Sequence, residues 1–155
     1  MIVVRKAVPD DAERIVDIRR TGWREAYGHL LSAEYLAAMP VDPERWRGYI
    51  EAGSPIMVAE LDGDVVGVVL AGEARDSDAP RDLQLWMIYQ YSRAYGSGTG
   101  QAMLDAAIGD APAYLWVAED NPRAHAFYRR NGFVPDGARD IHADAENLAE
   151  IRMVR

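Results

Sequence analysis

The amino-terminal third of the chain carries a hydrophobic pattern that predicts one strand followed by helices. Residues 2–7, IVVRKA, are predicted to form a strand. A proline and two acids then suit the positive end of a helix, whose apolar positions approximate one stripe as far as Tyr27. Gly22 lies inside this helix and is expected to loosen or bend it. Ser32 is placed to cap a second helix, and Asp42 to cap a third.

From residue 55 onward the pattern changes to strands. Residues 55–61 and 65–75 are predicted as two strands around the turn DGD, in which Asp62-Gly63 strongly favours a tight hairpin. Residues 83–91, LQLWMIYQY, carry so few charges that both faces of this strand are expected to be covered. The remaining predicted elements are a helix over QAMLDAAIG, a buried strand at 113–119, a helix capped by Asn121 and closed by Gly132, and two final strands.

A strand, a glycine-rich loop, a helix and another strand follow one another between residues 83 and 119. This order is a βαβ unit, whose strands should be parallel and whose crossover should be right-handed. The other strands are predicted to pair as antiparallel hairpins. The expected fold class is therefore mixed α/β, with a central, mostly antiparallel sheet of six to seven strands and about four helices on both faces.

Composition excludes several kinds of chemistry. The chain has 155 residues, 49% hydrophobic and 27% charged, which suits one domain with a single core. It contains no cysteine, so disulfides, thiolate metal sites and a cysteine nucleophile are excluded. No apolar run approaches the ~20 residues of a membrane span, and no signal-peptide pattern is present. A cytoplasmic location without a membrane partner is therefore expected.

The net charge of −8 argues against nucleic acid as a partner. The most basic stretch, RAHAFYRR, places Arg123, Arg129 and Arg130 on one predicted helix, where they are interpreted as a solvated face. The histidines lack the spacing of metal ligands, so no metal is expected; they are His29, His125 and His142.

The stretch YGSGTGQAML, residues 95–104, places three glycines where a helix should begin. A glycine inside a helix costs about 1 kcal/mol relative to alanine, whereas a helix amino terminus with bare backbone can bind phosphate. The phosphate loop of ATPases requires Gly-Lys-Ser/Thr, but Gln101 follows Gly100 here. The dinucleotide-binding fingerprint G-x-G-x-x-G requires a third glycine, but its position is Gln101 when counted from Gly96 and Met103 when counted from Gly98. A glycine-rich turn without a ligand stays open as the plainest interpretation.

The same stretch resembles the R/Q-x-x-G-x-G/A acyl-CoA loop of the GNAT superfamily of N-acetyltransferases. The best register places Gly98 and Gly100 on the motif glycines, because QAML then matches the helix that follows. Tyr95 then stands where the family has arginine or glutamine. A second register, Arg93-x-x-Gly96-x-Gly98, keeps the arginine but displaces the helix.

A second stretch, LWVAEDNPRAHAFYRRNGF, is similar to the fifth strand and following helix of that family. There an asparagine contacts the cofactor and a tyrosine seven residues later points at its sulfur, a spacing that Asn121 and Tyr128 reproduce. The resemblance is good over residues 55–155, whereas the first 50 residues agree only in the arrangement of their predicted elements. It implies an acyl-CoA N-acyltransferase fold with a splayed parallel strand pair. It also implies a single domain, 1–155, with acceptor-side elements in 1–54 and the acetyl-CoA core in 55–155.

The resemblance further implies acetyl-CoA as the acyl donor. Tyr128 is expected to protonate the leaving thiolate, and the backbone of residues 88–90 to pair with the pantetheine arm. The expected cofactor-binding residues are Ile88, Tyr89, Gln90, Tyr95, Gly96, Ser97, Gly98, Thr99, Gly100, Gln101 and Asn121.

The proton acceptor for the amine is not assigned by the resemblance. Many relatives place a glutamate on the strand before the loop, but this chain has Gln84, which cannot take a proton. The remaining candidates are Glu25, Glu60, Asp82 and Glu119. The acceptor is expected to be a primary amine of a small molecule or peptide, and Glu25 and the net charge favour a cationic one. It is predicted to meet Trp23, Glu25, Tyr27, Gln84 and Glu119.

Two classes of function fit these residues. Because no cysteine can carry the acetyl group, direct attack by the amine in a ternary complex is predicted rather than a ping-pong mechanism. The alternative is a non-catalytic acyl-CoA-binding sensor of the same fold, which Gln84 keeps open. A tRNA-directed acetyltransferase toxin would need a basic face, against which the net charge argues. A homodimer is left open.

Overall fold

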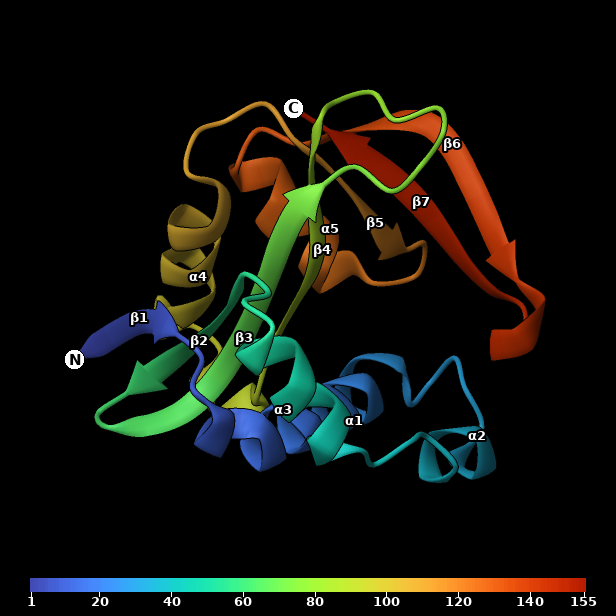
Figure 1. Cartoon of the computed structure of the whole chain (residues 1–155). Helices are drawn as coiled ribbons and strands as arrows, with labels where there is room; N and C mark the ends of the chain where they lie inside the picture. The colour runs from blue at the N-terminus through green and yellow to red at the C-terminus, as the bar shows by residue number, and fades with distance from the viewer.

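One seven-stranded sheet organises the molecule, and the computed structural model describes every residue from 1 to 155. The strand order is β1-β2-β3-β4-β5-β7-β6, and all neighbours are antiparallel except β4 and β5 (Figure 1). This confirms the predicted fold class and the parallel pair. The strands are β1 (Ile2–Lys6), β2 (Ile56–Leu61), β3 (Asp64–Glu73), β4 (Leu83–Gln90), β5 (Tyr114–Ala118), β6 (Val134–His142) and β7 (Leu148–Val154).

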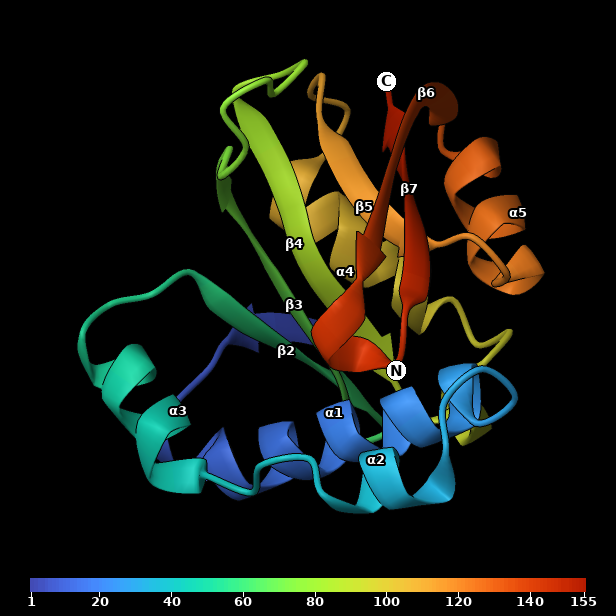
Figure 2. The same cartoon turned by 90° about the vertical axis from the view of Figure 1, so that its right-hand side faces the viewer.

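Helices cover both faces of the sheet, as predicted (Figures 1 and 2). α4 and α5 pack on one face, in a core that includes Leu104 and Phe133. α1 and α3 pack on the other face, around Ile15 and Trp46. None of the helices has the length and apolar character needed to cross a membrane. The five helices are α1 (Ala12–Tyr27), α2 (Ala33–Ala37), α3 (Pro43–Glu51), α4 (Thr99–Ile108) and α5 (Pro122–Arg130).

The local signals in the sequence place most element boundaries. The side chains of Ser32, Asp42 and Asn121 accept hydrogen bonds from the backbone N–H three residues later, at 3.0, 3.0 and 3.2 Å. These three caps therefore begin α2, α3 and α5 as predicted. Asp62 and Gly63 have φ of 52° and 86°, the conformation of the tight turn that joins β2 to β3.

Gly22 has a role different from the one predicted. α1 continues as a helix through this position rather than being interrupted there. A Cβ added at Gly22 would lie 3.4 Å from the ring of Tyr89, which packs against it. Gly22 thus lies where α1 packs directly on Tyr89 of β4.

The parallel pair of β4 and β5 separates after two residues. Only Gln84 and Leu85 pair with β5, opposite Tyr114 and Leu115. On its other side, β4 has a bulge at Trp86. Met87 and Leu85 pair with the consecutive β3 residues Leu70 and Ala71, so Trp86 has no partner of its own. A bulge bends its strand and strengthens the local twist. The second half of β4 thus presents an open edge toward β5.

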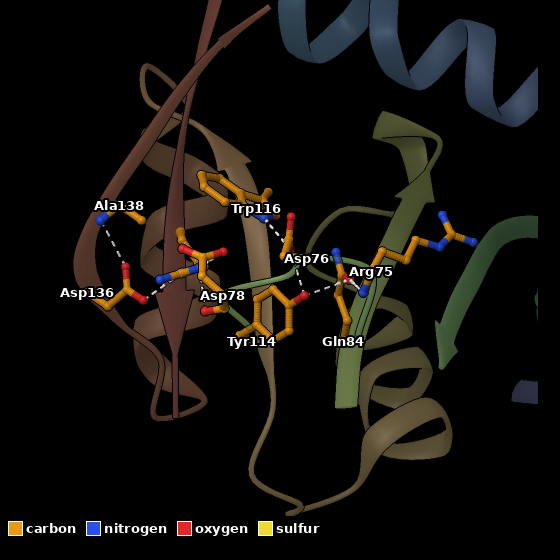
Figure 3. A network of polar contacts seen from close by, with 9 residues as sticks. Arg75, Asp76, Asp78, Gln84, Tyr114, Trp116, Asp136 and Ala138 are labelled. Atoms are coloured by element: carbon orange, nitrogen blue, oxygen red, sulfur yellow. Dashed lines mark hydrogen bonds and ion pairs between the residues drawn. The ribbon is translucent and has the colours of Figure 1, made fainter. Parts of the chain in front are cut away.

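A polar network closes the paired end of β4 and β5 (Figure 3). The Tyr114 hydroxyl and the Trp116 Nε1 donate to one oxygen of Asp76, at 2.6 and 3.0 Å. The Arg75 N–H donates to the side-chain oxygen of Gln84 at 2.9 Å. These bonds hold the β3–β4 loop, which arches toward β6 and β7 in Figure 1. The strands are therefore fixed at one end and apart at the other.

Candidate active site

A cavity of about 910 Å³ lies where β4 and β5 separate. Its lining includes Trp23 and Tyr27 of α1, which cover one face of the sheet, and Phe127 and Tyr128 of α5, which cover the other. The cavity therefore passes through the sheet between the two strands. Such a passage lets two ligands approach one another from opposite faces.

Most of the predicted site residues line this one cavity. They are Trp23, Glu25, Tyr27, Gln84, Ile88, Tyr89, Gln90, Tyr95, Gly96, Gly98, Gly100, Gln101, Asn121 and Tyr128. Ser97, Thr99 and Glu119 do not. The Ser97 hydroxyl donates to the Ala94 carbonyl at 2.6 Å, and Thr99 is fully buried. Glu119 is paired with Arg139 at 2.9 Å.

The three glycines of the loop serve two different needs. Gly96 and Gly98 have φ of 76° and 94°, a region that side chains other than glycine rarely adopt. Gly100 is helical, but a Cβ there would lie 3.5 Å from the Gln90 amide, facing the cavity. The first helical bond of α4 runs from Ala102 to Gly98, at 3.0 Å. The N–H groups of Gly100 and Gln101 precede it and are available to an anion.

Alanine at position 98 is expected to lower stability, and alanine at position 100 is not. Gly98→Ala forces a Cβ into the left-handed region and should lower the free energy of unfolding by about 1–2 kcal/mol. In a chain of this length, that corresponds to a melting temperature lower by roughly 3–6 °C. Gly100→Ala keeps a helical backbone and has only ordinary contacts. Thermal unfolding of both variants tests this, and equal melting temperatures would contradict it.

Arg123, expected on a solvated face of its helix, also supplies a cation beside the glycine-rich loop. Its guanidinium lies 3.5 Å from the centroid of the Tyr95 ring, and both residues line the cavity. Arg93, the arginine of the second register, instead bonds to Asp64 at 2.6 Å. Arg123, Arg129 and Arg130 are exposed, as the solvated face requires, but residue spacing along α5 does not show that Arg123 also reaches the loop.

Tyr128 is buried at the wall of the cavity, with 8% of its surface exposed. Burial raises the pKa of its phenol well above the ordinary value, and the nearby Tyr89 adds to this shift. No hydrogen bond to another protein group contributes to the shift. At neutral pH the hydroxyl is thus protonated and has a proton to donate.

Trp23, Tyr27 and Tyr89 form an aromatic wall on the α1 side. The Trp23 Nε1 donates to the Tyr89 hydroxyl at 2.9 Å, and the rings of Trp23 and Tyr27 meet edge to face at 4.8 Å. Burial raises the pKa of both tyrosines. The phenols consequently stay neutral, and the wall offers ring faces and polar tips to a ligand.

Glu25 and Gln84 line the cavity with their polar groups already engaged. The Glu25 carboxylate accepts from the Ser92 N–H and hydroxyl at 2.9 and 2.8 Å, which ties α1 to the loop after β4. Gln84 is buried and accepts the Arg75 N–H. Two other base candidates, Glu60 and Glu119, bond to arginines away from the cavity. Asp82 does not line the cavity either.

Glu150 is the carboxylate that the sequence analysis missed. It lies on β7, lines the cavity, and contributes through its charge to the raised pKa of Tyr27 and Tyr89. The His142 Nε2 lies 2.5 Å from its Oε1. No motif surrounds Glu150 in the sequence, so only the tertiary structure brings it to the site.

Comparison with known proteins agrees with this arrangement. Residues 12–133 match the acetyltransferase (GNAT) family model. An uncharacterized N-acetyltransferase of Mycobacterium tuberculosis is 29% identical over 129 residues, covering 79% of this chain and 72% of the relative. A protein of the same description from Mycobacterium bovis matches equally.

Solved structures of acetyltransferases have the same fold. The PaiA N-acetyltransferase of Thermoplasma acidophilum, in complex with coenzyme A, superposes with a TM-score of 0.76 at 19% identity, covering 98% of both chains. A ribosomal-protein-alanine N-acetyltransferase of Brucella melitensis gives 0.74 at 22% identity, covering 99% of this chain and 98% of the other. Since the family model spans most of the sequence and the fold agrees, the chain belongs to the GNAT family of acetyltransferases.

Proposed function

We propose that this protein transfers an acetyl group from acetyl-CoA to a primary amine by direct attack within a ternary complex. The observation that carries the proposal is the single cavity that joins the glycine loop, the open edge of β4 and the buried Tyr128 through the sheet. One domain, residues 1–155, supplies all of these parts. The acceptor side draws on residues 1–54 and also on Glu150 of the last strand.

The residues present fit the cofactor. The N–H groups of Gly100 and Gln101 would hold its diphosphate, and the backbone of β4 from Ile88 to Gln90 would pair with its amide-containing arm. The buried Oε1 of Gln90 has no hydrogen-bond partner within the protein, and Gln90 lines the cavity. Asn121 lines the same cavity. When bound, acetyl-CoA supplies the activated acetyl thioester.

Tyr128 and Glu150 divide the proton transfers in this proposal. A primary amine of pKa ~10.4 is only about one part in 10³ neutral at pH 7, so removal of its proton is required. Of the carboxylates that line the cavity, Glu25 is bonded to Ser92 and Asp120 lies beside His29, whereas Glu150 adjoins Tyr27 and Tyr89 of the aromatic wall, and it takes that proton. Tyr128 donates its phenolic proton to the departing sulfur. Because the chain has no cysteine, attack is direct.

The alternative function is a non-catalytic acyl-CoA sensor. The observation that favours it is Gln84, whose amide is bonded within the fold where many relatives have a glutamate. Incubation with acetyl-CoA and a panel of primary amines, while free thiol is measured, separates the two. Amine-dependent thiol release supports the transferase. Binding of CoA by calorimetry without thiol release from any amine would overturn it in favour of the sensor.

Arg123→Gln is expected to weaken acetyl-CoA binding about three- to tenfold. The guanidinium stacked on Tyr95 is the cation beside the glycine loop, and an exposed charge contributes modestly to phosphate binding. Calorimetric titration at low and high salt checks this, since the difference should shrink as salt screens the charge. Arg129→Gln is the matched control, on the same helix but outside the cavity. Equal losses in the two variants would exclude the role.

A further inference from the structure

A second cavity, of about 420 Å³, adjoins the first on the face covered by α1 and α3. The two cavities share Trp86, Met87 and Tyr89 of β4 as a common wall. The outer wall of the second comes from Arg19 of α1, from Trp46 and Tyr49 of α3, and from Arg75 of the β3–β4 loop. A ligand that enters the acceptor side of the first cavity therefore has this second space beside it.

Two guanidinium groups line the second cavity without any carboxylate partner. Arg19 lies over the Trp46 ring at 5.0 Å, and its buried Nε has no hydrogen-bond partner. Arg75 lies over the Trp86 ring at 3.7 Å, and only its backbone N–H makes a hydrogen bond. Figure 3 shows the Arg75 side chain directed away from the neighbouring Asp76 and its network. Each guanidinium therefore lies over an indole, and its N–H groups make no hydrogen bond to the protein.

Six of the sixteen arginines pair with carboxylates, and Arg19 and Arg75 are among those that do not. The protein has 25 acidic and 17 basic residues, so carboxylates are available to neutralise its arginines. Arg5, Arg47 and Arg152 each pair with two of them. The half-buried Arg19 guanidinium loses hydration without compensation unless an anion completes it, and the exposed Arg75 adds a second cation at the same cavity. Arg19 and Arg75 therefore point to an anion that binds between them.

We propose that the second cavity binds a carboxylate carried by the acceptor, so that the acetylated substrate is an amino acid with a chain of several carbons between its amine and its carboxylate, rather than a simple cationic amine. This rests on the proposed function. The guanidinium fork matches a carboxylate, and the indoles of Trp46 and Trp86 suit an apolar segment beside it. The amino group of the same molecule reaches past Tyr89 into the first cavity, toward Glu150 and Tyr128. The acceptor is thus held at both charged ends.

Calorimetry with matched ligands tests the proposal without requiring turnover. The protein saturated with CoA is titrated with 4-aminobutanoate, 6-aminohexanoate and 8-aminooctanoate, and with the carboxamide of each. At least one carboxylate should bind ten times more tightly than its amide. Acetate, which carries the charge alone, should compete with that ligand at millimolar concentration. Equal affinity for carboxylate and amide in all three pairs would overturn the inference.

Variants of the two arginines give the second arm of the test. Arg75→Gln and Arg19→Gln should each bring the carboxylate and amide affinities within twofold of one another. Arg20→Gln is the control, since Arg20 follows Arg19 on α1 but lines neither cavity. A preference retained in both Arg19→Gln and Arg75→Gln would refute the proposal. Arg75 is exposed on a loop, so its variant reports on binding even if the Arg19 variant is less stable.

The proposed function and this inference fail in different ways. If the carboxylate preference is present and depends on Arg75, yet no free thiol is released from acetyl-CoA, the transferase assignment fails and the anion site stands. If simple amines and amides are acetylated as fast as amino acids, the transferase assignment stands and the anion site fails.

Discussion

Replacing Tyr128 with phenylalanine is expected to lower kcat about 10²–10⁴-fold, the usual contribution of a general acid. Binding of acetyl-CoA should change less than about twofold, because the ring and its packing against Phe127 and Phe133 remain. The phenol is protonated at neutral pH because burial raises its pKa, so the variant removes a donor rather than a charge. Single-turnover thiol release, together with calorimetry, measures both quantities.

Stability separates this effect from misfolding. The Tyr128 hydroxyl has no protein hydrogen bond contributing to its pKa, so its removal should leave the melting temperature unchanged or slightly higher. Tyr35→Phe is the matched control, since Tyr35 lies on α2 outside the cavity. A Tyr128→Phe enzyme with the kcat of the wild type would remove Tyr128 from the mechanism and leave the sulfur to be protonated by water.

Features set by neighbouring residues could be predicted from the sequence. Asn121 caps α5 through a bond to a backbone N–H only three residues away, and Asp62-Gly63 forms its turn without help from the rest of the chain. The glycine loop is of the same kind, because the positive φ of Gly96 and Gly98 is a local requirement. These signals, together with the βαβ order, were sufficient for the fold class, whereas the expected site residues came from the resemblance to the GNAT superfamily.

Features set by contacts between distant segments could not be predicted. Glu150 reaches the cavity because β7 pairs with β5, which places Glu150 opposite Ala118 at the open end of the gap. Arg123 stacks on Tyr95 only because α5 lies beside the loop. Gly22 was interpreted from helix propensity alone, whereas its contact with Tyr89 lies 67 residues away. Charge and spacing along the chain contain none of this information.

The acceptor side illustrates the same limit. The net charge of −8 favours a cationic amine as acceptor, but a net charge averages over the whole surface. The arrangement of charges around the two cavities is more informative, since Glu150 faces one of them while Arg19 and Arg75 face the other. An acidic protein can therefore carry a cationic cavity, and the amino-acid acceptor that we propose rests on local rather than total charge.

Glu150→Gln is expected to lower kcat/KM about 10²-fold at pH 7, where nearly all of the acceptor amine carries its proton. The loss should shrink as the pH rises and fall below about threefold near pH 10, because the amine, of pKa ~10.4, then needs no base. Tyr128 still carries its proton there, since burial raises its pKa. Rate profiles of wild type and variant between pH 6 and 10 measure this convergence.

The shape of the profile decides whether Glu150 takes a proton or only positions the substrate. The groups that face it are Tyr27 of α1, Tyr89 of β4, and Asp140 and His142 of β6. A residue that merely orients the amine would lose the same factor at every pH, so parallel profiles would reject the base. Glu119→Gln is the matched control, because Glu119 is bound to Arg139 outside the cavity and should leave the profile unchanged. Convergence in Glu150→Gln alone would identify the carboxylate of β7 as the proton acceptor.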